Sequence, residues 1–278
     1  MDHEREYNNR ARVPAWSEIF GDWQRRSATL RGAVAAADLG VPYGPTERQF
    51  LDILWPDTSR NAPVLLYIHG GYWQYSHPRD VTFVAEGCLA NGVAVALAGY
   101  DLAPDVPLAT IIRQVRGAAV TLHHRVRRRL AVAGHSAGGH LAAALTATSW
   151  HDLDTRGPDD LITGGLGIAG VYDVVPLVQT SMNEKLRLTA DEAERLSPIH
   201  WPVPEGRSFT AVAGGAESDE FRRQARDMAA RWASAGCAAE ALEVADANHF
   251  TVVEQMADPA SPMVQRIVGY ARDAAARG

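Results

Sequence analysis

The chain has 278 residues, a net charge of −6, and 46% hydrophobic and 22% charged residues. This length and composition are typical of one large soluble α/β domain. No stretch approaches the ~20 apolar residues that a membrane-spanning helix needs, and the N-terminus lacks the apolar core of a signal peptide. The one basic run, residues 123–129, lies at the end of a predicted helix, where cations are favourable, so no nucleic-acid partner is expected.

The two cysteines, Cys88 and Cys237, have neither the spacing of metal ligands nor a C-x-x-C partner. Both lie in apolar surroundings and are expected to be buried, reduced thiols. With no targeting or membrane signal, this favours a cytoplasmic protein. No metal and no organic cofactor is expected.

Residues 1–40 are expected to form an N-terminal segment that is first polar and then helical. A helix beginning near Pro14 would place its aromatic and aliphatic residues on one face, at Trp16, Ile19, Phe20 and Trp23. Such a segment can simply pack against the domain, or it can cover an active site. In the second case Tyr7 and Trp16 are candidates for the wall of a pocket.

From residue 49 onward, apolar runs alternate with helical patterns. The runs predict strands at 49–55, 63–69, 93–98, 130–133, 166–169, 209–213 and 239–244. Helices are predicted at 78–91, 107–128, from 141, 191–196, 219–235 and from about 259 to the end. The first of these strands is expected to be antiparallel. The alternation predicts a mostly parallel sheet of about eight strands with helices on both faces, in a single domain spanning 1–278. The irregular, proline-marked stretch 174–206 is a candidate small cap.

The pattern Gly134-His135-Ser136-Ala137-Gly138 stands between a predicted strand and a helix of small residues. This context is typical of a nucleophile elbow, a sharp turn that projects a serine hydroxyl above a sheet. The glycines leave room because a β-carbon would collide with neighbouring backbone. A glycine-rich turn without catalytic function is the alternative, and the other residues of the site must decide between them.

A serine hydroxyl needs a base to remove its proton, and the base needs an orienting acid. His249 follows the last predicted strand and comes after both the serine and an acid, so it is the expected base. Glu217 follows the preceding strand and is the favoured acid. Asp219 is a rival that could instead cap the next helix, and Asp173 is a third, weaker candidate.

An acyl-transfer enzyme also needs donors for the oxyanion. The stretch His69-Gly70-Gly71-Tyr72-Trp73 follows a buried strand and supplies backbone N–H groups at Gly70, Gly71 and Tyr72, and Ala137 supplies another. His69 is expected to brace this loop. The aromatic residues expected to line a substrate pocket are Trp73 and Tyr172, with Tyr72 and Tyr75 beside them; ordinary packing is the alternative for each. Asn183 is a weaker candidate for a polar substrate contact.

Several segments together resemble the kynurenine formamidase (arylformamidase) group of α/β-hydrolases, namely His69–Trp73, Gly134–His140, Gly170–Asp173, Glu217–Phe221 and Asn248–Phe250. The resemblance runs from about Tyr7 to His249. It implies the α/β-hydrolase fold and cleavage of N-formyl-kynurenine to kynurenine and formate. Many members of the group carry Asp where this chain has Glu217, which keeps Asp219 in consideration.

The expected activity is therefore that of a serine hydrolase acting on a small molecule. The first alternative is a carboxylesterase acting on small acyl or aromatic esters, since the family shades into such enzymes. The second is a non-catalytic scaffold that binds a small ligand. Neither a membrane nor a nucleic acid is an expected partner, and a homodimer is left open.

Overall fold

The computed structural model describes residues 2–154, 156–203 and 205–277. Its centre is a sheet of eight strands in the described part of the chain, in the order β1-β2-β4-β3-β5-β6-β7-β8. The strands are β1 (Ala36–Pro42), β2 (Phe50–Trp55), β3 (Val64–Ile68), β4 (Ala94–Ala98), β5 (Leu130–His135), β6 (Ile162–Ile168), β7 (Ser208–Gly214) and β8 (Ala238–Val244). The pairs β1–β2 and β2–β4 are antiparallel, and the remaining pairs are parallel. This confirms the predicted α/β-hydrolase arrangement.

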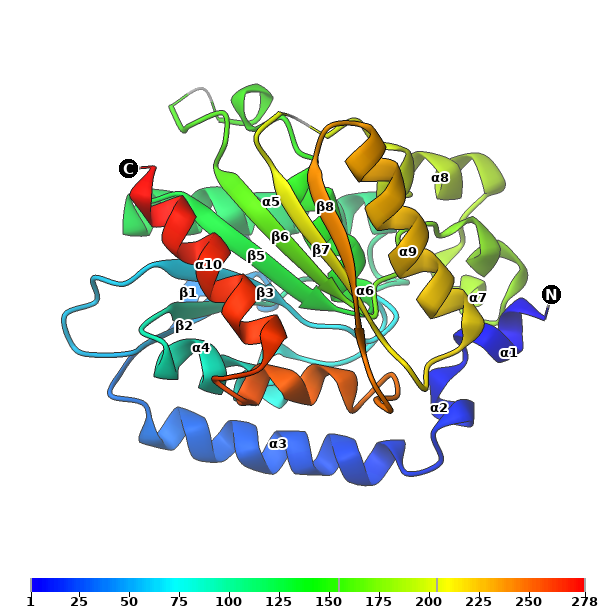
Figure 1. Ribbon diagram of the computed structural model, residues 1–278, viewed down its shortest axis with the longest axis horizontal. Helices are drawn as coiled ribbons and strands as arrows, with labels where there is room; N and C mark the ends of the chain where they lie inside the picture. Colours follow the sequence, from blue (N-terminus) through cyan, green and yellow to red (C-terminus); the bar gives the residue numbers. More distant parts are fainter. Residues whose placement is uncertain (1, 155, 204, 278) are drawn as a thin grey trace.

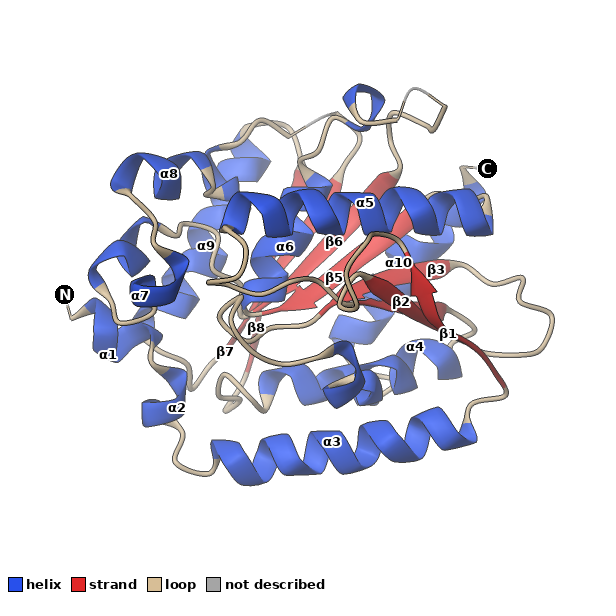
Figure 2. Ribbon diagram, turned by 180° about the vertical axis from the view of Figure 1, so that it is seen from behind, coloured by secondary structure: helices blue, strands red, loops and turns tan. Residues whose placement is uncertain are grey.

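Helices cover both faces of this sheet (Figure 1). The α-helices are α1 (His3–Tyr7), α2 (Asn9–Arg12), α3 (Trp16–Ala33), α4 (Glu86–Ala90), α5 (Leu108–Val126), α6 (Ala137–Thr146), α7 (Asn183–Leu186), α8 (Ala190–Arg195), α9 (Asp219–Ser234) and α10 (Pro262–Ala276). Short 3₁₀ helices are η1 (Pro78–Asp80), η2 (Thr82–Ala85), η3 (Trp150–Asp152), η4 (Val175–Gln179), η5 (Pro198–His200) and η6 (Val252–Ala257). Helices α5 and α6 lie on one face (Figure 2), and α4 and α10 on the other.

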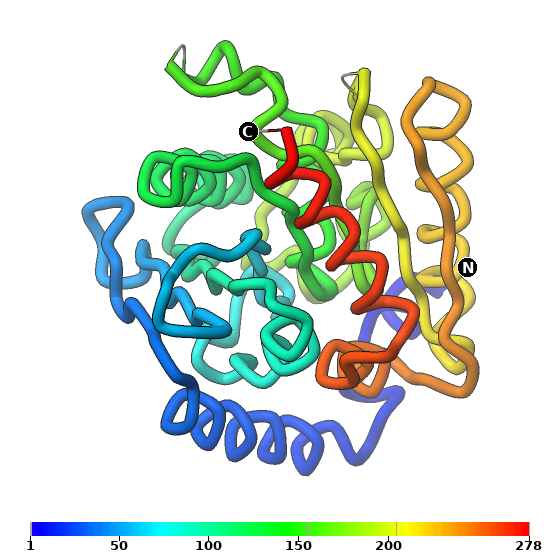
Figure 3. The backbone as a smooth tube through the Cα atoms, turned by 60° about the vertical axis from the view of Figure 1, so that its left-hand side comes forward, coloured from blue at the N-terminus to red at the C-terminus, as the bar shows by residue number. Residues whose placement is uncertain are grey.

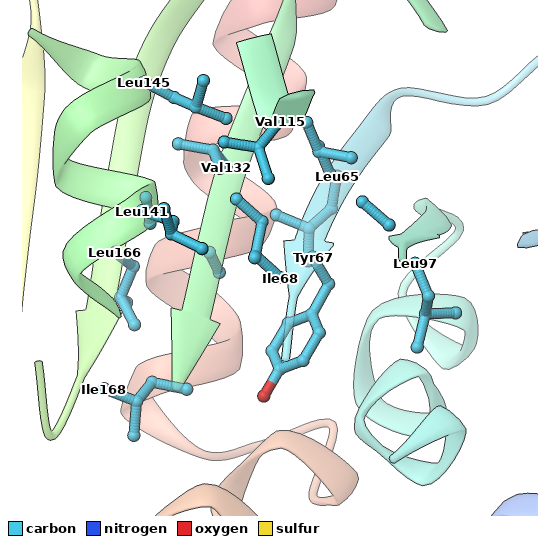
Figure 4. Close-up of a cluster of buried hydrophobic side chains, with 14 of the residues drawn as sticks. Leu65, Tyr67, Ile68, Leu97, Val115, Val132, Leu141, Leu145, Leu166 and Ile168 are labelled. Atoms are coloured by element: carbon cyan, nitrogen blue, oxygen red, sulfur yellow. The ribbon is translucent and has the colours of Figure 1, made fainter. Parts of the chain in front are cut away.

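The core is formed by the apolar runs that predicted the central strands. Every residue of β3, β4, β5 and β6 is buried, as expected for parallel strands with helices on both sides. Their side chains pack against leucines of α6 and against Val115 of α5 (Figure 4). Among the described residues, no helix is both long and apolar enough to cross a membrane.

Several predicted elements differ from the structure. The N-terminal segment is not helical to residue 40, because β1 forms an edge strand there whose pairing is interrupted by a bulge between Asp38 and Val41. The predicted strand 166–169 begins earlier, at Ile162. The C-terminal helix begins at Pro262, with Ser261 capping its first turn, and η6 precedes it.

The predicted helix 78–91 is broken into η1, η2 and α4. Ser27 of α3 explains the break, because its hydroxyl donates to the carbonyl of Asp80 and accepts from the amide of Phe83. These are backbone groups that a continuous helix would pair internally. The hydroxyl therefore joins α3 to this region, and α3 packs on η1 and η2.

The N-terminal segment is held to the domain at several points. The Tyr7 hydroxyl donates to Glu220 and accepts from Gln224, both at 2.8 Å, on α9. At the other end, the Trp23 indole N–H donates to Glu254 at 3.3 Å. Figure 3 shows α3, in blue, below the orange segment that follows β8. The stretch 174–206 contains four short helices, η4, α7, α8 and η5; its role as a cap stays a prediction, and Pro204 lies outside the described residues.

Candidate active site

The turn between β5 and α6 places Ser136 at the carboxyl end of the central strands. Ser136 has φ 56° and ψ −117°, a conformation that is costly for a residue with a side chain. A β-carbon at Gly134 would lie 2.2 Å from the carbonyl oxygen of Gly138, and one at Gly138 would lie 2.0 Å from that of Ile68. Both positions therefore require glycine, and the tight strand–turn–helix geometry of a nucleophile elbow is present.

The loop after β8 brings His249 against the loop after β7. The His249 Nδ1 lies 2.7 Å from Glu217 Oε1, and both side chains are buried. The other carboxylate oxygen, Oε2, accepts from the backbone N–H of Gly214 at 2.8 Å. Two hydrogen bonds thus fix the carboxylate, and the carboxylate orients the ring and leaves Nε2 as the nitrogen that can exchange a proton.

The two rival acids lie elsewhere. Asp219 is the first residue of α9; its side chain is 80% exposed and pairs with Arg222. It does not cap the helix, because Ser218 does so. Asp173 accepts from the amide of Val175 and from the Ser197 hydroxyl. Of the three candidates, Glu217 alone contacts His249.

Ser136 and His249 line the same pocket. Among the described residues, the Ser136 hydroxyl makes no hydrogen bond to His249. In ligand-free enzymes such bonds are often long and tighten only when the substrate binds. Rings pack around His249, with the centroids of Phe221 and His135 at 4.6 and 4.8 Å, so its position is restricted on two sides.

The four backbone N–H groups expected to bind the oxyanion, those of Gly70, Gly71, Tyr72 and Ala137, lie close to Ser136 and have no hydrogen-bond acceptor among the described residues. The loop that carries the first three has left-handed backbone at Gly71, Tyr72 and Trp73, with φ of 115°, 55° and 57°. A β-carbon at Gly70 would lie 2.6 Å from the carbonyl of His135 and 3.1 Å from Cβ of Ser136. The loop therefore lies directly against the elbow, and its amides can serve as an oxyanion hole.

Two other histidines near the site are not placed to act as the base. His69 stacks on Tyr100 with centroids 4.3 Å apart, and the Tyr100 hydroxyl donates to the His69 carbonyl. The His135 Nε2 lies 2.8 Å from the carbonyl of His249. Burial lowers the pKa of each ring to about 3. Both rings are therefore neutral near pH 7. The His69 Nδ1 also lies 2.8 Å from the carbonyl of Gly70, so His69 braces this loop as the sequence predicted.

A large pocket opens beside Ser136, with a volume of about 330 Å³. Helix α3 contributes three aromatic walls, Trp16, Phe20 and Trp23, so the N-terminal segment does cover the site. Trp16 was expected, whereas Phe20 and Trp23 were predicted only to pack, although their spacing places them on the same face as Trp16. The other lining residues are Arg10, Gly70, Gly71, Tyr72, Tyr75, Ser76, Asp80, Val81, His135, His249 and Phe250.

A second, very small cavity lies on another side of the serine, with a volume of about 10 Å³. It is lined by Tyr7, Tyr72, Trp73, Ser136, Ala137, Val171, Leu177, Met182 and Phe221. Trp73 therefore borders the serine as expected, but in the small cavity and not in the large pocket. Tyr7, the other N-terminal candidate, also lies here.

Two of the expected substrate contacts are absent from both cavities. Tyr172 is fully buried, and its hydroxyl donates to the carbonyl of Gly167 at 2.9 Å. Its ring fills the space beside Gly167 and Gly170, where a β-carbon would lie 2.3 to 2.5 Å from it. Asn183 binds backbone groups of Val178 and Leu188 and so closes a local turn. Both side chains are used for structure.

The described residues contain no group of three or more His, Cys, Asp or Glu side chains placed to hold a metal. Cys88 and Cys237 are free and buried, as predicted.

The comparisons with known proteins agree with this geometry. The model of a family described as "alpha/beta hydrolase fold" matches residues 65–253. The kynurenine formamidase of Danio rerio is 31% identical over 84% of this chain and 82% of its own length. The chain belongs to the kynurenine formamidase-like α/β-hydrolases.

Two further relatives support this assignment. The kynurenine formamidase of Salmo salar is 34% identical over 79% of this chain and 77% of its own length. The solved structure of a candidate thioesterase from Silicibacter superposes with a TM-score of 0.87 at 29% identity, covering 96% of this hydrolase and 99% of that protein. The resemblance predicted from the sequence motifs is confirmed.

Proposed function

We propose that this hydrolase cleaves small aryl formamides, with N-formyl-kynurenine as the expected substrate and kynurenine and formate as products. The observation that carries the proposal is the difference between the two cavities that meet at Ser136. The small one, of about 10 Å³, has room for little more than one water-sized group. The large one, of about 330 Å³, has aromatic walls suited to a flat ring.

In this proposal the formyl group, the smallest acyl group, is held at the small cavity and the arylamine at the large pocket. The Ser136 oxygen attacks the formyl carbon while His249 Nε2 takes the hydroxyl proton, and Glu217 stabilises the imidazolium that forms. The amides of Gly71, Tyr72 and Ala137 bind the oxyanion. The loop of Gly70 brings the first two of these amides to the serine.

Collapse of the tetrahedral intermediate breaks the carbon–nitrogen bond, and His249 returns its proton to the leaving amine. Water, deprotonated by the same ring, then attacks the formyl ester on Ser136. Breakdown of this second intermediate releases formate and restores the serine hydroxyl. All proton transfers use one nitrogen of one ring, and the hydrogen bond from His249 Nδ1 to Glu217 keeps that nitrogen available.

A carboxylesterase acting on small aryl esters is the second candidate, because the aromatic pocket would hold a phenol as well as an arylamine. The small cavity also limits the acyl group in this alternative. An acetyl group is larger than a formyl group by one methyl group, and a butyryl group is larger still. An esterase of this geometry would favour the shortest acyl groups.

The test is a paired turnover assay on the purified protein. N-formyl-kynurenine is compared with p-nitrophenyl acetate and butyrate, with Ser136→Ala as the blank. We expect kcat/KM for the formamide to exceed that for both esters, and Ser136→Ala to lower turnover of all three by about 10⁶-fold, as for other serine hydrolases. Ester cleavage with negligible formamide turnover would instead establish an esterase. Retained turnover in Ser136→Ala would overturn the mechanism.

The cytoplasm is the location we propose, because both cysteines are free thiols and disulfides are rare in that compartment. The proposed partner is the small-molecule substrate, and a homodimer stays a prediction.

A further inference from the structure

Arg10 is a charged residue in the wall of the large pocket that the mechanism does not use. It lies in α2, at the turn into the aromatic helix α3. Its guanidinium carbon is 4.5 Å from the centre of the Trp16 ring and 4.7 Å from that of Tyr75. Two aromatic rings, one from the N-terminal segment and one from the loop that carries the oxyanion amides, therefore hold this cation.

The guanidinium has no polar partner in the part of the chain that the structure describes: neither an ion pair nor a side-chain hydrogen bond joins it to a described residue. Its neighbour Arg12 differs, because it pairs with Glu6 at 3.9 Å. Asp80, the acidic residue of the same pocket, also has a partner, since its Oδ1 accepts from Gln24 at 2.9 Å. Of these three side chains, Arg10 alone has neither an ion pair nor a side-chain hydrogen bond to a described residue.

The surroundings add to the positive charge at this point. Lys185 lies on Tyr75 as well, with its ammonium 4.6 Å from the ring centre and 3.0 Å from the hydroxyl. Arg10 also borders a neighbouring polar hollow of about 310 Å³, which Lys185 and Glu184 help to line. Glu184 makes no ion pair with Arg10 in the described structure. The hollow thus borders Arg10 on a second side.

A guanidinium is always charged and offers five N–H donors in a planar fork that matches a carboxylate. Contact with ring faces fixes its position without using those donors. Ser136 lines the same pocket, so a substrate bound at the serine extends toward the arginine. We propose that Arg10 binds a carboxylate on the leaving group of the substrate, and that the pocket selects anionic aryl substrates over uncharged ones. This inference rests on the proposed function, because it assigns the large pocket to the leaving group.

Arg10 could instead serve only to join the two rings and hold the N-terminal segment in place. Substrate charge separates the two roles, because a structural role would affect charged and uncharged substrates alike. A matched pair is ortho-formamidoacetophenone, which is uncharged, and desamino-N-formylkynurenine, which has the same aryl ketone extended by a carboxylate. The measured quantity is the ratio of their kcat/KM values within one preparation, so that loss of folded enzyme cancels.

The variants are Arg10→Gln, Arg10→Lys and, as a control, Arg12→Gln, which removes the same charge two residues away. We expect the wild-type enzyme to prefer the carboxylate substrate and Arg10→Gln to lower that preference by about 10- to 100-fold, mainly through KM. Arg10→Lys should fall between, because it keeps the charge and loses the fork. Arg12→Gln should leave the ratio within about twofold. An unchanged ratio in Arg10→Gln would overturn the proposal.

Failure of the proposed function is recognised separately. If neither formamide is cleaved, the same ratio is measured with phenyl acetate and para-acetoxyphenylacetate, which test the leaving-group pocket without a formyl group. A preference for the carboxylate ester that Arg10→Gln removes would support the subsite and refute the formamidase. No preference with either pair would refute the subsite.

Discussion

The two cavities at Ser136 differ in size and in the origin of their walls. The small one is closed mainly by buried side chains of the domain, such as Leu177 and Phe221, which are 1% exposed. The large one takes three aromatic walls and Arg10 from the N-terminal segment. The difference teaches that the cavity proposed for the acyl group is set mainly by buried side chains, with Tyr7 the one contribution of the N-terminal segment, whereas that segment forms much of the pocket proposed for the leaving group.

The largest effect should come from Glu217, which holds His249 and therefore affects catalysis whatever group occupies either cavity. Glu217→Gln keeps the shape of the acid but removes the charge that stabilises the imidazolium, so kcat should fall by about 10⁴-fold for formamides and esters alike. Asp219→Asn is the matched control. Its side chain points to solvent, and kcat should change less than twofold. Steady-state kinetics on both variants check this, and the reverse order would refute the assignment of Glu217.

Enlarging the small cavity should alter selectivity for the acyl group more than selectivity for the leaving group. Met182→Ala removes part of its wall, so the rate for an N-acetyl arylamide relative to its N-formyl analogue should rise about 10-fold, the usual size of a one-carbon discrimination. Met263→Ala removes a buried methionine of α10 that lines neither cavity. If both variants change the ratio equally, the cavity does not control the acyl group.

The histidines that pack behind the cavities should make stability depend on pH. Burial lowers the pKa of His135, beside the large pocket, to about 3, and that of His140, against Trp73, to about 4. The unfolded chain binds protons at both rings below pH ~6.5 and the folded chain does not. The free energy of unfolding should therefore fall as pH drops from 6.5, by up to about 1.4 kcal/mol per pH unit for each ring.

Urea unfolding at pH values between 7.5 and 5 measures this dependence. Protons taken up on unfolding, followed in weakly buffered solution, give an independent value for the same quantity. A free energy of unfolding that stays constant over this range would show that these rings titrate normally in the folded protein.

The smallest effect is expected at the outer wall of the large pocket. Trp16→Ala removes one ring face and should raise KM for an uncharged aryl formamide about three- to tenfold. Ethyl formate, whose leaving group has no ring, should be nearly unaffected. Trp201→Ala is the control, because this half-buried tryptophan bonds to Arg195 outside both cavities. An equal loss for both substrates would mean that Trp16 acts on stability and not on recognition.

Much of this molecule could be predicted from its sequence because its signals are local. The apolar runs of β3, β4 and β5 predicted buried parallel strands, and the glycine pattern around Ser136 predicted the elbow. The pairing of Glu217 with His249 followed from their places after consecutive strands. In each case the backbone position alone restricts where the side chain can lie.

What the sequence did not predict depends mainly on contacts between distant segments, with Tyr172 and its nearby glycines as the exception. Ser27 breaks a helix more than fifty positions later by bonding to Asp80 and Phe83. Strand β6 begins with a weak strand sequence, Ile-Thr-Gly-Gly, because Tyr270 and Thr146 need the space beside Gly164 and Gly165. Tyr172 resembled a pocket aromatic, yet Gly167 and Gly170 make room for it inside the domain. None of these partners is adjacent in the chain.

The attachment of α3 has a consequence for how such enzymes diversify. Its three pocket rings precede every residue of the proposed triad and oxyanion loop, and they reach the serine from outside the sheet. We expect that replacing this helix with that of a relative changes these walls, provided that the contacts of Ser27 and Trp23 with the domain are kept. Replacing residues 1–33 with those of a relative, while keeping the contacts of Tyr7 and Trp23, is therefore a way to change which leaving groups the enzyme accepts.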